Sequence, residues 1–323
     1  MKFLYFMLNH RRIVLIVVLL FSALMVNAWG FWAHQRINHY ACFTLPPVMF
    51  AFYKVNIDYI TSHAVDPDQR RYSDPDEAPR HFIDIDHYGS VEAIPFRFDD
   101  AVCMYSADTV QAHGIVPWAI QDFYFRLVKA FSSKDVGHIL YYSACLGHYI
   151  GDAHVPLHCT HNYNGQLTGQ NGIHGFWESR LPELFGSEYD YLSDRAAYID
   201  HPLKRAWITI RQSSGAVDSV LTFEKQLNGQ IAADLKYTFE LRGQLLVRTY
   251  STNYSKAYDA MLDGQVERRM RCAIQCVGDY WYSAWVDAGM PDLNMLCIDE
   301  KMKTDSSNFQ FNSVSVLKGD REE

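Results

Sequence analysis

Apolar residues recur every three or four positions along most of this chain, and few runs alternate between polar and apolar residues. That spacing is typical of amphipathic helices. With proline, glycine and capping residues taken as helix ends, the predicted helices cover residues 33–43, 48–62, 117–131, 133–154, 173–181 and 253–287. Ser133 is the expected N-cap of the fourth helix. The chain shows no internal repeat, so the pattern predicts one all-α domain over residues 29–298 and a polar tail over 299–323.

The first 28 residues have the composition of a secretory signal. Lys2, Arg11 and Arg12 precede an apolar run at 13–26, and small residues end at Ala28. The run is shorter than the roughly 20 residues that span a bilayer, although an uncleaved membrane anchor is the alternative. Cleavage would make Trp29 the first residue and place the protein outside the cytoplasm, secreted or periplasmic.

The charge of the chain restricts its partners. Its formal net charge is −8 at pH 7, and the signal segment carries basic residues but no acidic ones, so the processed chain is more acidic still. Proteins that grip long duplex DNA by its phosphates are usually basic. A phosphate-bearing substrate would therefore need local attraction, which divalent ions supply. The seven cysteines are an odd number, so at least one stays outside any intrachain disulfide, and their connectivity stays open.

Histidines and carboxylates recur at spacings typical of metal sites. His148 and Asp152 are four residues apart in a predicted helix, so both project from one face. His174 and Glu178 repeat this spacing, and a proline two residues before His158 would turn that side chain back toward a second ion. Imidazole nitrogen and carboxylate oxygen together suit zinc. One such pair alone is weak evidence for a metal site. The combined pattern favours a metal centre over a helix of hydrogen-bonded histidines.

The motifs that carry a family resemblance are Trp29-Gly30, His34, Asp66, His81-Phe82-Ile83-Asp84, Gly151-Asp152-x-His154-x-Pro156-Leu157-His158 and His174…Glu178. In this order they resemble the zinc-dependent superfamily of phospholipase C and the single-strand-specific nucleases of fungi and plants (S-one/P-one type). The motifs span residues 29 to 178, and the remaining chain matches only in being helical. The resemblance implies a single-domain helical fold with three zinc ions at the bottom of a cleft.

The resemblance also implies a ligand set. One zinc would be held by Asp66, His81, His148 and Asp152. A second would be held by His158, His174 and Glu178. The third would be held by the amine and carbonyl of Trp29, by His34 and by the other oxygen of Asp152. Asp66 and Asp152 would thus be catalytic through the ions, and a hydroxide bridging two zinc ions would be the nucleophile.

Two substrate classes compete within the superfamily. The fifteen-residue gap from Asp66 to His81 resembles the nucleases, whereas Glu178 and the short gap from His158 to His174 resemble bacterial phospholipases C. We expect an endonuclease acting on single-stranded DNA, RNA or nucleotides. A phospholipase C acting on phospholipid head groups is the alternative, and a non-catalytic, zinc-stabilised envelope protein is a third possibility. No obligate protein partner is evident, and a monomer is expected.

Four side chains are candidates for substrate contact. Phe82 would stack on a base, although a core position is an equal alternative, and Asp84 would accept hydrogen bonds from the base edge. Arg70 or Arg71 would clamp the phosphate, with Arg70 the first choice. The nuclease family has its arginine three residues after the aspartate, where Gln69 stands here. Asn171 would be a further contact.

Overall fold

The structure is a computed structural model that describes residues 30–293 and 296. The predicted signal segment, Trp29 and the predicted tail lie outside the described residues. The described chain is mostly helical, which confirms the all-α class. Within it, the sheet structure is one two-stranded antiparallel hairpin, β1 (Tyr237–Arg242) paired with β2 (Leu245–Tyr250).

The helices of six or more residues are α2 (Phe31–Ala41), α3 (Pro47–Val55), α4 (Ile57–Ser62), α6 (Phe98–Tyr105), α7 (Ala107–Ala112), α8 (Val116–Ser133), α9 (Val136–Ala153), α12 (Pro202–Ser214), α13 (Val217–Gln230), α14 (Thr252–Leu262) and α15 (Gln265–Asp287). The shorter helical turns are η1 (Cys42–Thr44), η2 (His63–Val65), α5 (Asp66–Arg70), η3 (Ala78–His81), η4 (Ile85–His87), η5 (Val91–Ala93), η6 (Pro156–Cys159), α10 (Ile173–Gly175), η7 (Phe176–Arg180, a π-helical turn), α11 (Leu181–Phe185) and η8 (Ala233–Leu235).

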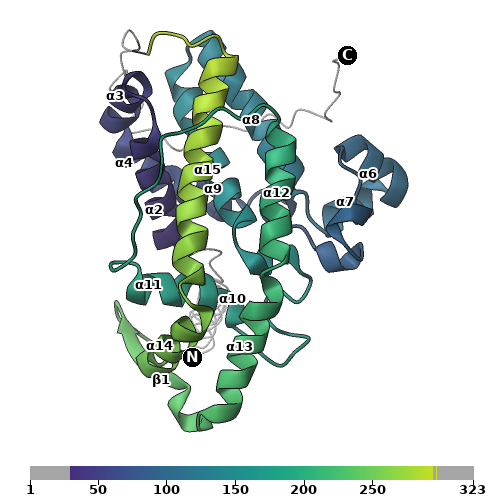
Figure 1. The fold of residues 1–323 in the computed structure, drawn as a ribbon, viewed down its shortest axis with the longest axis vertical. Helices are drawn as coiled ribbons and strands as arrows, with labels where there is room; N and C mark the ends of the chain where they lie inside the picture. The colour runs from purple at the N-terminus through teal and green to yellow at the C-terminus, as the bar shows by residue number, and fades with distance from the viewer. Residues whose placement is uncertain (1–29, 294–295, 297–323) are drawn as a thin grey trace, which may run out of the picture.

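Helix α15 runs along much of the length of the molecule (Figure 1) and packs against α2, α8 and α9. Its apolar face is fully buried, and Trp281 stacks on Tyr53 of α3 with ring centroids 4.9 Å apart. The Trp281 indole also donates a hydrogen bond to the Ser143 carbonyl of α9, at 3.0 Å. Burial of such large aromatic groups contributes much of the stability of a core. The core therefore fixes α9 firmly, and α9 carries the central residues of the site.

Helices α2 and α9 approach each other closely at a glycine. A Cβ added at Gly147 would lie 2.0 Å from Oδ1 of Asn38 on α2. The Asn38 amide donates to the Ala144 carbonyl at 3.1 Å, which joins the two helices. One turn along α2, the ring of His34 stacks on that of His148, with centroids 3.9 Å apart. A glycine at this point thus brings histidines from two helices together.

Three helix predictions differ from the structure in detail. The predicted helix 48–62 is two helices, because Asn56 leaves the helical region with φ −108°. Lys134 adopts a left-handed conformation that ends α8, so Asp135, and not Ser133, caps α9 and accepts from the His138 backbone N–H. The predicted helix 253–287 is broken at Asp263 and Gly264, which both have positive φ. Left-handed residues end helices, which explains the last two differences.

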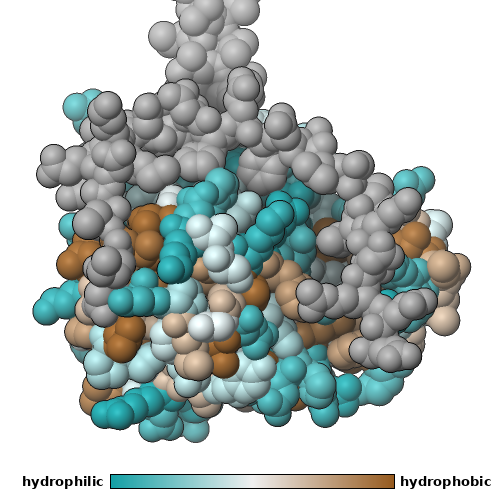
Figure 2. Space-filling model, turned by 90° about the horizontal axis from the view of Figure 1, so that it is seen from above, coloured by the Kyte–Doolittle hydropathy of each residue, from teal (hydrophilic) through white to brown (hydrophobic). Residues whose placement is uncertain are grey.

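The hairpin escaped prediction because its strands do not alternate cleanly. Phe239, Leu241, Leu245 and Leu246 are all exposed, so apolar residues do not mark one buried face. Elsewhere, hydrophilic and hydrophobic residues are interspersed on the described surface that is visible in Figure 2. Within the described residues, every helix is too short or too polar to cross a membrane.

Candidate metal centre

Eight side chains from seven elements converge near the C-terminal end of α9. They are His34 (α2), Asp68 (α5), His81 (η3), His148 and Asp152 (α9), His158 (η6), His174 (α10) and Glu178 (η7), and all eight are buried. They form three overlapping or adjacent groups whose nitrogen and oxygen atoms lie within 4.8 Å of one another. A group of this kind could hold a metal ion.

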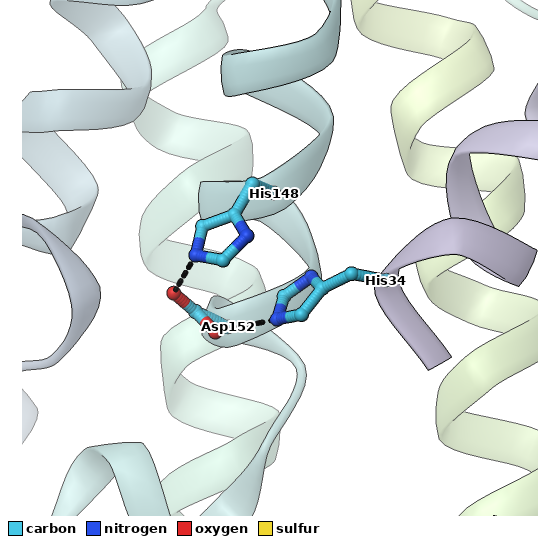
Figure 3. Close-up of side chains that lie close together, drawn as sticks. All are labelled: His34, His148 and Asp152. Atoms are coloured by element: carbon cyan, nitrogen blue, oxygen red, sulfur yellow. Dashed lines mark ion pairs between the residues drawn. The ribbon is translucent and has the colours of Figure 1, made fainter. Parts of the chain in front are cut away.

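Asp152 lies between two histidines from different helices (Figure 3). Its Oδ1 is 3.3 Å from Nε2 of His34, and its Oδ2 is 3.2 Å from Nε2 of His148. Because His148 and Asp152 are about one turn apart on α9, both project from the face of that helix that is turned toward His34 of α2. The two oxygens of one carboxylate therefore point to different partners, as a bridging ligand requires.

A second group adds Asp68 and His81. Oδ1 of Asp68 lies 3.7 Å from both Nδ1 of His81 and Nε2 of His148. Nδ1 of His81 is also 2.8 Å from Oδ2 of Asp152 and 3.1 Å from Nε2 of His148. Nδ1 of His148 donates to the Ala64 carbonyl at 2.8 Å. That bond orients the ring and leaves its Nε2 lone pair directed at the group.

The third group is formed by His158, His174 and Glu178. Nε2 of His158 is 3.2 Å from Nε2 of His174, and Oε2 of Glu178 is 3.4 Å and 3.0 Å from these two nitrogens. Nδ1 of His158 donates to the His81 carbonyl at 2.5 Å, so its Nε2 faces the group. Glu178 lies on the π-helical turn η7, a local distortion that is frequent at functional sites.

The donor atoms are spaced as tetrahedral ligands would be. Two zinc ligands at about 2.0–2.1 Å and at the tetrahedral angle are about 3.3 Å apart, and most distances in the three groups cluster around that value. By contrast, the partly buried pair His63–Asp66 and the more exposed pair His138–Asp135 are each at 2.7 Å. In the described chain, no well-formed hydrogen bond reaches either carboxylate oxygen of Asp68 or Glu178. Buried carboxylates need compensation, and a cation would provide it.

The electrostatics keep the carboxylates in their ligating form. Burial alone would raise the pKa of Asp152, but the charges of His148 and His158 hold it well below the ordinary value. The pKa of Glu178 is lowered in the same way, against burial, by His174 and His158. Burial would lower the pKa of His158, yet Asp152 and Glu178 raise it to about 9. A bound metal ion would replace the protons of these histidines as the positive charge that balances the carboxylates.

The structure brings Asp68, and not the predicted Asp66, to this centre. Asp66 lies on the other side of α5, where its Oδ2 pairs with Nδ1 of His63 at 2.7 Å and its side chain is partly exposed. Successive helical residues are rotated by about 100°. Asp66 and Asp68 are two residues apart and therefore lie on nearly opposite faces of α5. The other described members of the predicted ligand set are all in the three groups. Trp29 lies outside the described residues.

Arg70 also differs from its predicted role. It points into the protein, where its Nε donates to Oε2 of the buried Glu77 at 3.3 Å and its NH2 donates to the Tyr149 hydroxyl at 3.3 Å. Oε1 of Glu77 in turn faces Nε2 of His81 at 3.5 Å. Arg70 thus supports a residue behind His81, as groups that orient metal ligands do. Arg71 faces the centre instead, with NH1 3.8 Å from Oδ1 of Asp68.

A cleft of about 390 Å³ opens beside these groups. Its lining residues are Arg71, His81, Phe82, Asp84, Ala112, Leu157, His158, Thr160, His161, Tyr163, Asn164 and His174. Phe82 is half-buried and Asp84 is buried, and both face the cleft as well as the protein. Three histidines of the buried groups, His81, His158 and His174, therefore open onto a space that a small ligand can enter.

Neither protein-family models nor curated proteins give a match for this chain.

The remaining candidate for substrate contact, Asn171, is exposed and does not line this cleft. Asn164 does, and its Oδ1 accepts a hydrogen bond from the backbone N–H of Gly172 at 3.0 Å. Tyr163 also lines the cleft, edge-on to His174 with ring centroids 5.8 Å apart. Both residues lie in the Gly/Asn-rich loop that follows the His158 motif. That position was a usable signal in the sequence, because loops next to ligands often carry specificity.

Proposed function

We propose that this protein is a zinc-dependent phosphodiesterase that hydrolyses single-stranded nucleic acid. The observation that carries the proposal is the opening of the buried histidine–carboxylate groups onto a cleft with aromatic and hydrogen-bonding walls. The mixed nitrogen and oxygen donors favour zinc among the common divalent ions. When bound, closely spaced zinc ions lower the pKa of water and offset the charge of a phosphodiester.

Under this proposal the chain holds three zinc ions. The ligands would be Asp68, His81, His148 and Asp152 for one ion, His158, His174 and Glu178 for the second, and His34 and Asp152 with the amine and carbonyl of Trp29 for the third. The processed N-terminus belongs to the proposal, as do export to the periplasm or the exterior and a monomeric state. Because its two oxygens face different histidines, Asp152 would be shared between two of these ions.

The side chains of the cleft suit a nucleotide chain. Phe82 and Tyr163 offer ring faces on which bases stack, a contact worth about 1–3 kcal/mol per base. Asp84 and Asn164 offer an acceptor and an amide for the edge of a base. Arg71, next to Asp68, offers guanidinium donors for a phosphate. The rings, the carboxylate, the amide and the guanidinium line the same cleft as the histidines, so a phosphodiester could lie between the base contacts and the metal centre.

A phospholipid is the second candidate substrate, and the hairpin is the observation that favours it. Phe239, Leu241, Leu245 and Leu246 are each more than 60% exposed, whereas most large apolar residues of soluble proteins are buried. Such a hairpin could enter the apolar layer of a membrane and bring a lipid head group to the centre.

The test uses the processed protein, loaded with zinc, and the variant Asp152→Ala. We expect Asp152→Ala to lose nearly all activity and about two bound zinc ions per chain, because two groups share this carboxylate. Bound zinc is counted by mass spectrometry, and rates are compared on single-stranded DNA, RNA and phosphatidylcholine vesicles. Asp122→Ala, which removes a surface pair with Arg126, is the matched control. Near-normal zinc content and turnover in Asp152→Ala would refute the proposal, and faster cleavage of the lipid would replace the nuclease with the phospholipase.

A further inference from the structure

Another group of ligating side chains lies at the rim of the cleft, apart from the three buried groups. Asp84, His113 and His161 bring one carboxylate oxygen and two imidazole nitrogens within 4.8 Å of one another. None of the three belongs to the buried groups. His161 is 61% exposed in its side chain, and His113 is 21% exposed, so solvent reaches the group directly.

The backbone holds His113 in place. The backbone N–H of Asp84 donates to the His113 carbonyl at 2.8 Å. The next residue, Gly114, has φ +88°, and a Cβ there would lie 2.1 Å from the Phe82 carbonyl oxygen. Only glycine fits this approach. The turn that carries His113 is thus packed tightly against the segment that carries Asp84.

A separate anchor holds His161. Its backbone N–H donates to Oδ1 of Asp86 at 2.9 Å, and the Thr160 hydroxyl donates to Oδ2 of the same carboxylate at 2.7 Å. Asp86 lies two residues after Asp84. The short segment that carries both aspartates is therefore bonded to the backbone at His113 and at His161. The three ligating side chains therefore converge because the backbones that carry them are bonded together.

The spacing within this group suits ligands of one metal ion, although the His113–Asp84 contact also has the length of a hydrogen bond. Nδ1 of His113 is 3.2 Å from Oδ2 of Asp84, and Nδ1 of His161 is 3.5 Å from the same oxygen. Two histidine–aspartate pairs elsewhere, His63–Asp66 and His138–Asp135, are 2.7 Å apart, whereas tetrahedral zinc ligands are about 3.3 Å apart. The ring of His87 stacks on that of His113 with centroids 3.3 Å apart, which limits rotation of the His113 ring.

We propose that Asp84, His113 and His161 form a separate site for one divalent transition-metal ion of the zinc class. Two histidines and one carboxylate, with the remaining positions open to water, are a donor set that such ions accept. An ion at this exposed site exchanges more readily than ions in the buried groups. It puts positive charge at the rim of the cleft of an acidic protein. While it is bound, Asp84 serves as its ligand and not as a direct base contact.

The experiment counts ions by calorimetric titration with Zn²⁺ after the buried groups have been filled. The wild-type protein should bind one further ion per chain, more weakly than the others. His161→Ala and His113→Ala should each weaken that step by at least ~100-fold, since loss of a group that only orients a ligand already costs about 10–100-fold. His138→Ala is the control, because His138 pairs with Asp135 on the surface and, among the described residues, belongs to no ligand group.

His161 is exposed, so His161→Ala should fold normally, which thermal unfolding verifies. The proposal is overturned if the wild-type protein shows no additional step. It is equally overturned if His161→Ala binds the additional ion as tightly as the wild-type protein does. Activity is not measured, so the result does not depend on the proposed function.

Discussion

At the level of single residues, Asp152 is the side chain that connects the histidines of α2 and α9. One turn of α9 aligns it with His148, and the approach of α2 brings His34 to its other oxygen. Its own pKa is held low by the histidines it faces, despite complete burial. The carboxylate beside His81 and His148, by contrast, depends on which aspartate of the sequence Asp66-Pro67-Asp68 faces inward. That choice separates Asp68 from Asp66, two residues of the same chemistry in the same short helix.

The first prediction compares these two aspartates. Asp68→Asn should lower zinc affinity strongly, with activity falling in proportion, because it removes a charged donor from His81 and His148. Asp66→Asn should leave zinc affinity within about twofold, since it breaks only the pair with His63, which lies outside the three groups. Titration with a competing chelator measures both. If Asp66→Asn proves the more damaging variant, the assignment of Asp68 is wrong.

At the level of elements, a small number of close contacts decide where the ligating side chains meet. Gly147 allows α2 to reach α9, and Gly278 allows the chain around Thr44 to reach α15, since a Cβ at 278 would lie 1.8 Å from Oγ1 of Thr44. Helical spacing in the sequence predicted α2, α8, α9 and α15 and placed His148 and Asp152 on one face of α9, but it left α12 and α13 unpredicted. It did not predict which face of α5 turns inward, nor the break at Asp263 and Gly264, because these depend on contacts between distant segments.

The second prediction concerns the glycine contact between α2 and α9. Gly147→Ala should destabilise the protein by about 1–3 kcal/mol, as overpacking in a core does, because the new methyl group collides with Asn38. It should also weaken zinc binding, since His34 and His148 depend on the same approach. Urea unfolding measures the stability of both metal-free and zinc-loaded protein.

Gly229→Ala is the matched control. Nothing lies within 4 Å of a Cβ at this helical position, so the substitution should stabilise the protein by up to about 1 kcal/mol through helix propensity. Equal losses in the two variants would show that the contact at Gly147 has no special importance.

At the level of the whole molecule, ions bound at the centre would make the stability of the fold depend on metal and proton concentrations. The candidate ligands lie on α2, α5, η3, α9 and the segments that follow α9, which are distant in sequence, so ions bound there would connect separate parts of the fold. Metal binding requires deprotonated histidines, and its free energy adds to that of folding. Without ions, the same buried carboxylates stabilise the protonated form of His158 instead. The two states of the protein should therefore respond to pH in opposite directions.

The third prediction follows from His158. Its pKa in the folded, metal-free protein is raised to about 9, because Asp152 and Glu178 outweigh the effect of burial, whereas an unfolded histidine has a pKa near 6.5. A pKa raised by folding contributes stability that is complete below the unfolded value and is lost as pH rises through the folded value. After chelation, the free energy of unfolding should thus fall between about pH 6.5 and 9. Zinc-loaded protein should become more stable over the same range, because protons then compete less with zinc. Urea unfolding at a series of pH values measures both trends. His158→Gln, studied metal-free, should lack most of the decline, and an undiminished decline in that variant would assign the effect to other groups.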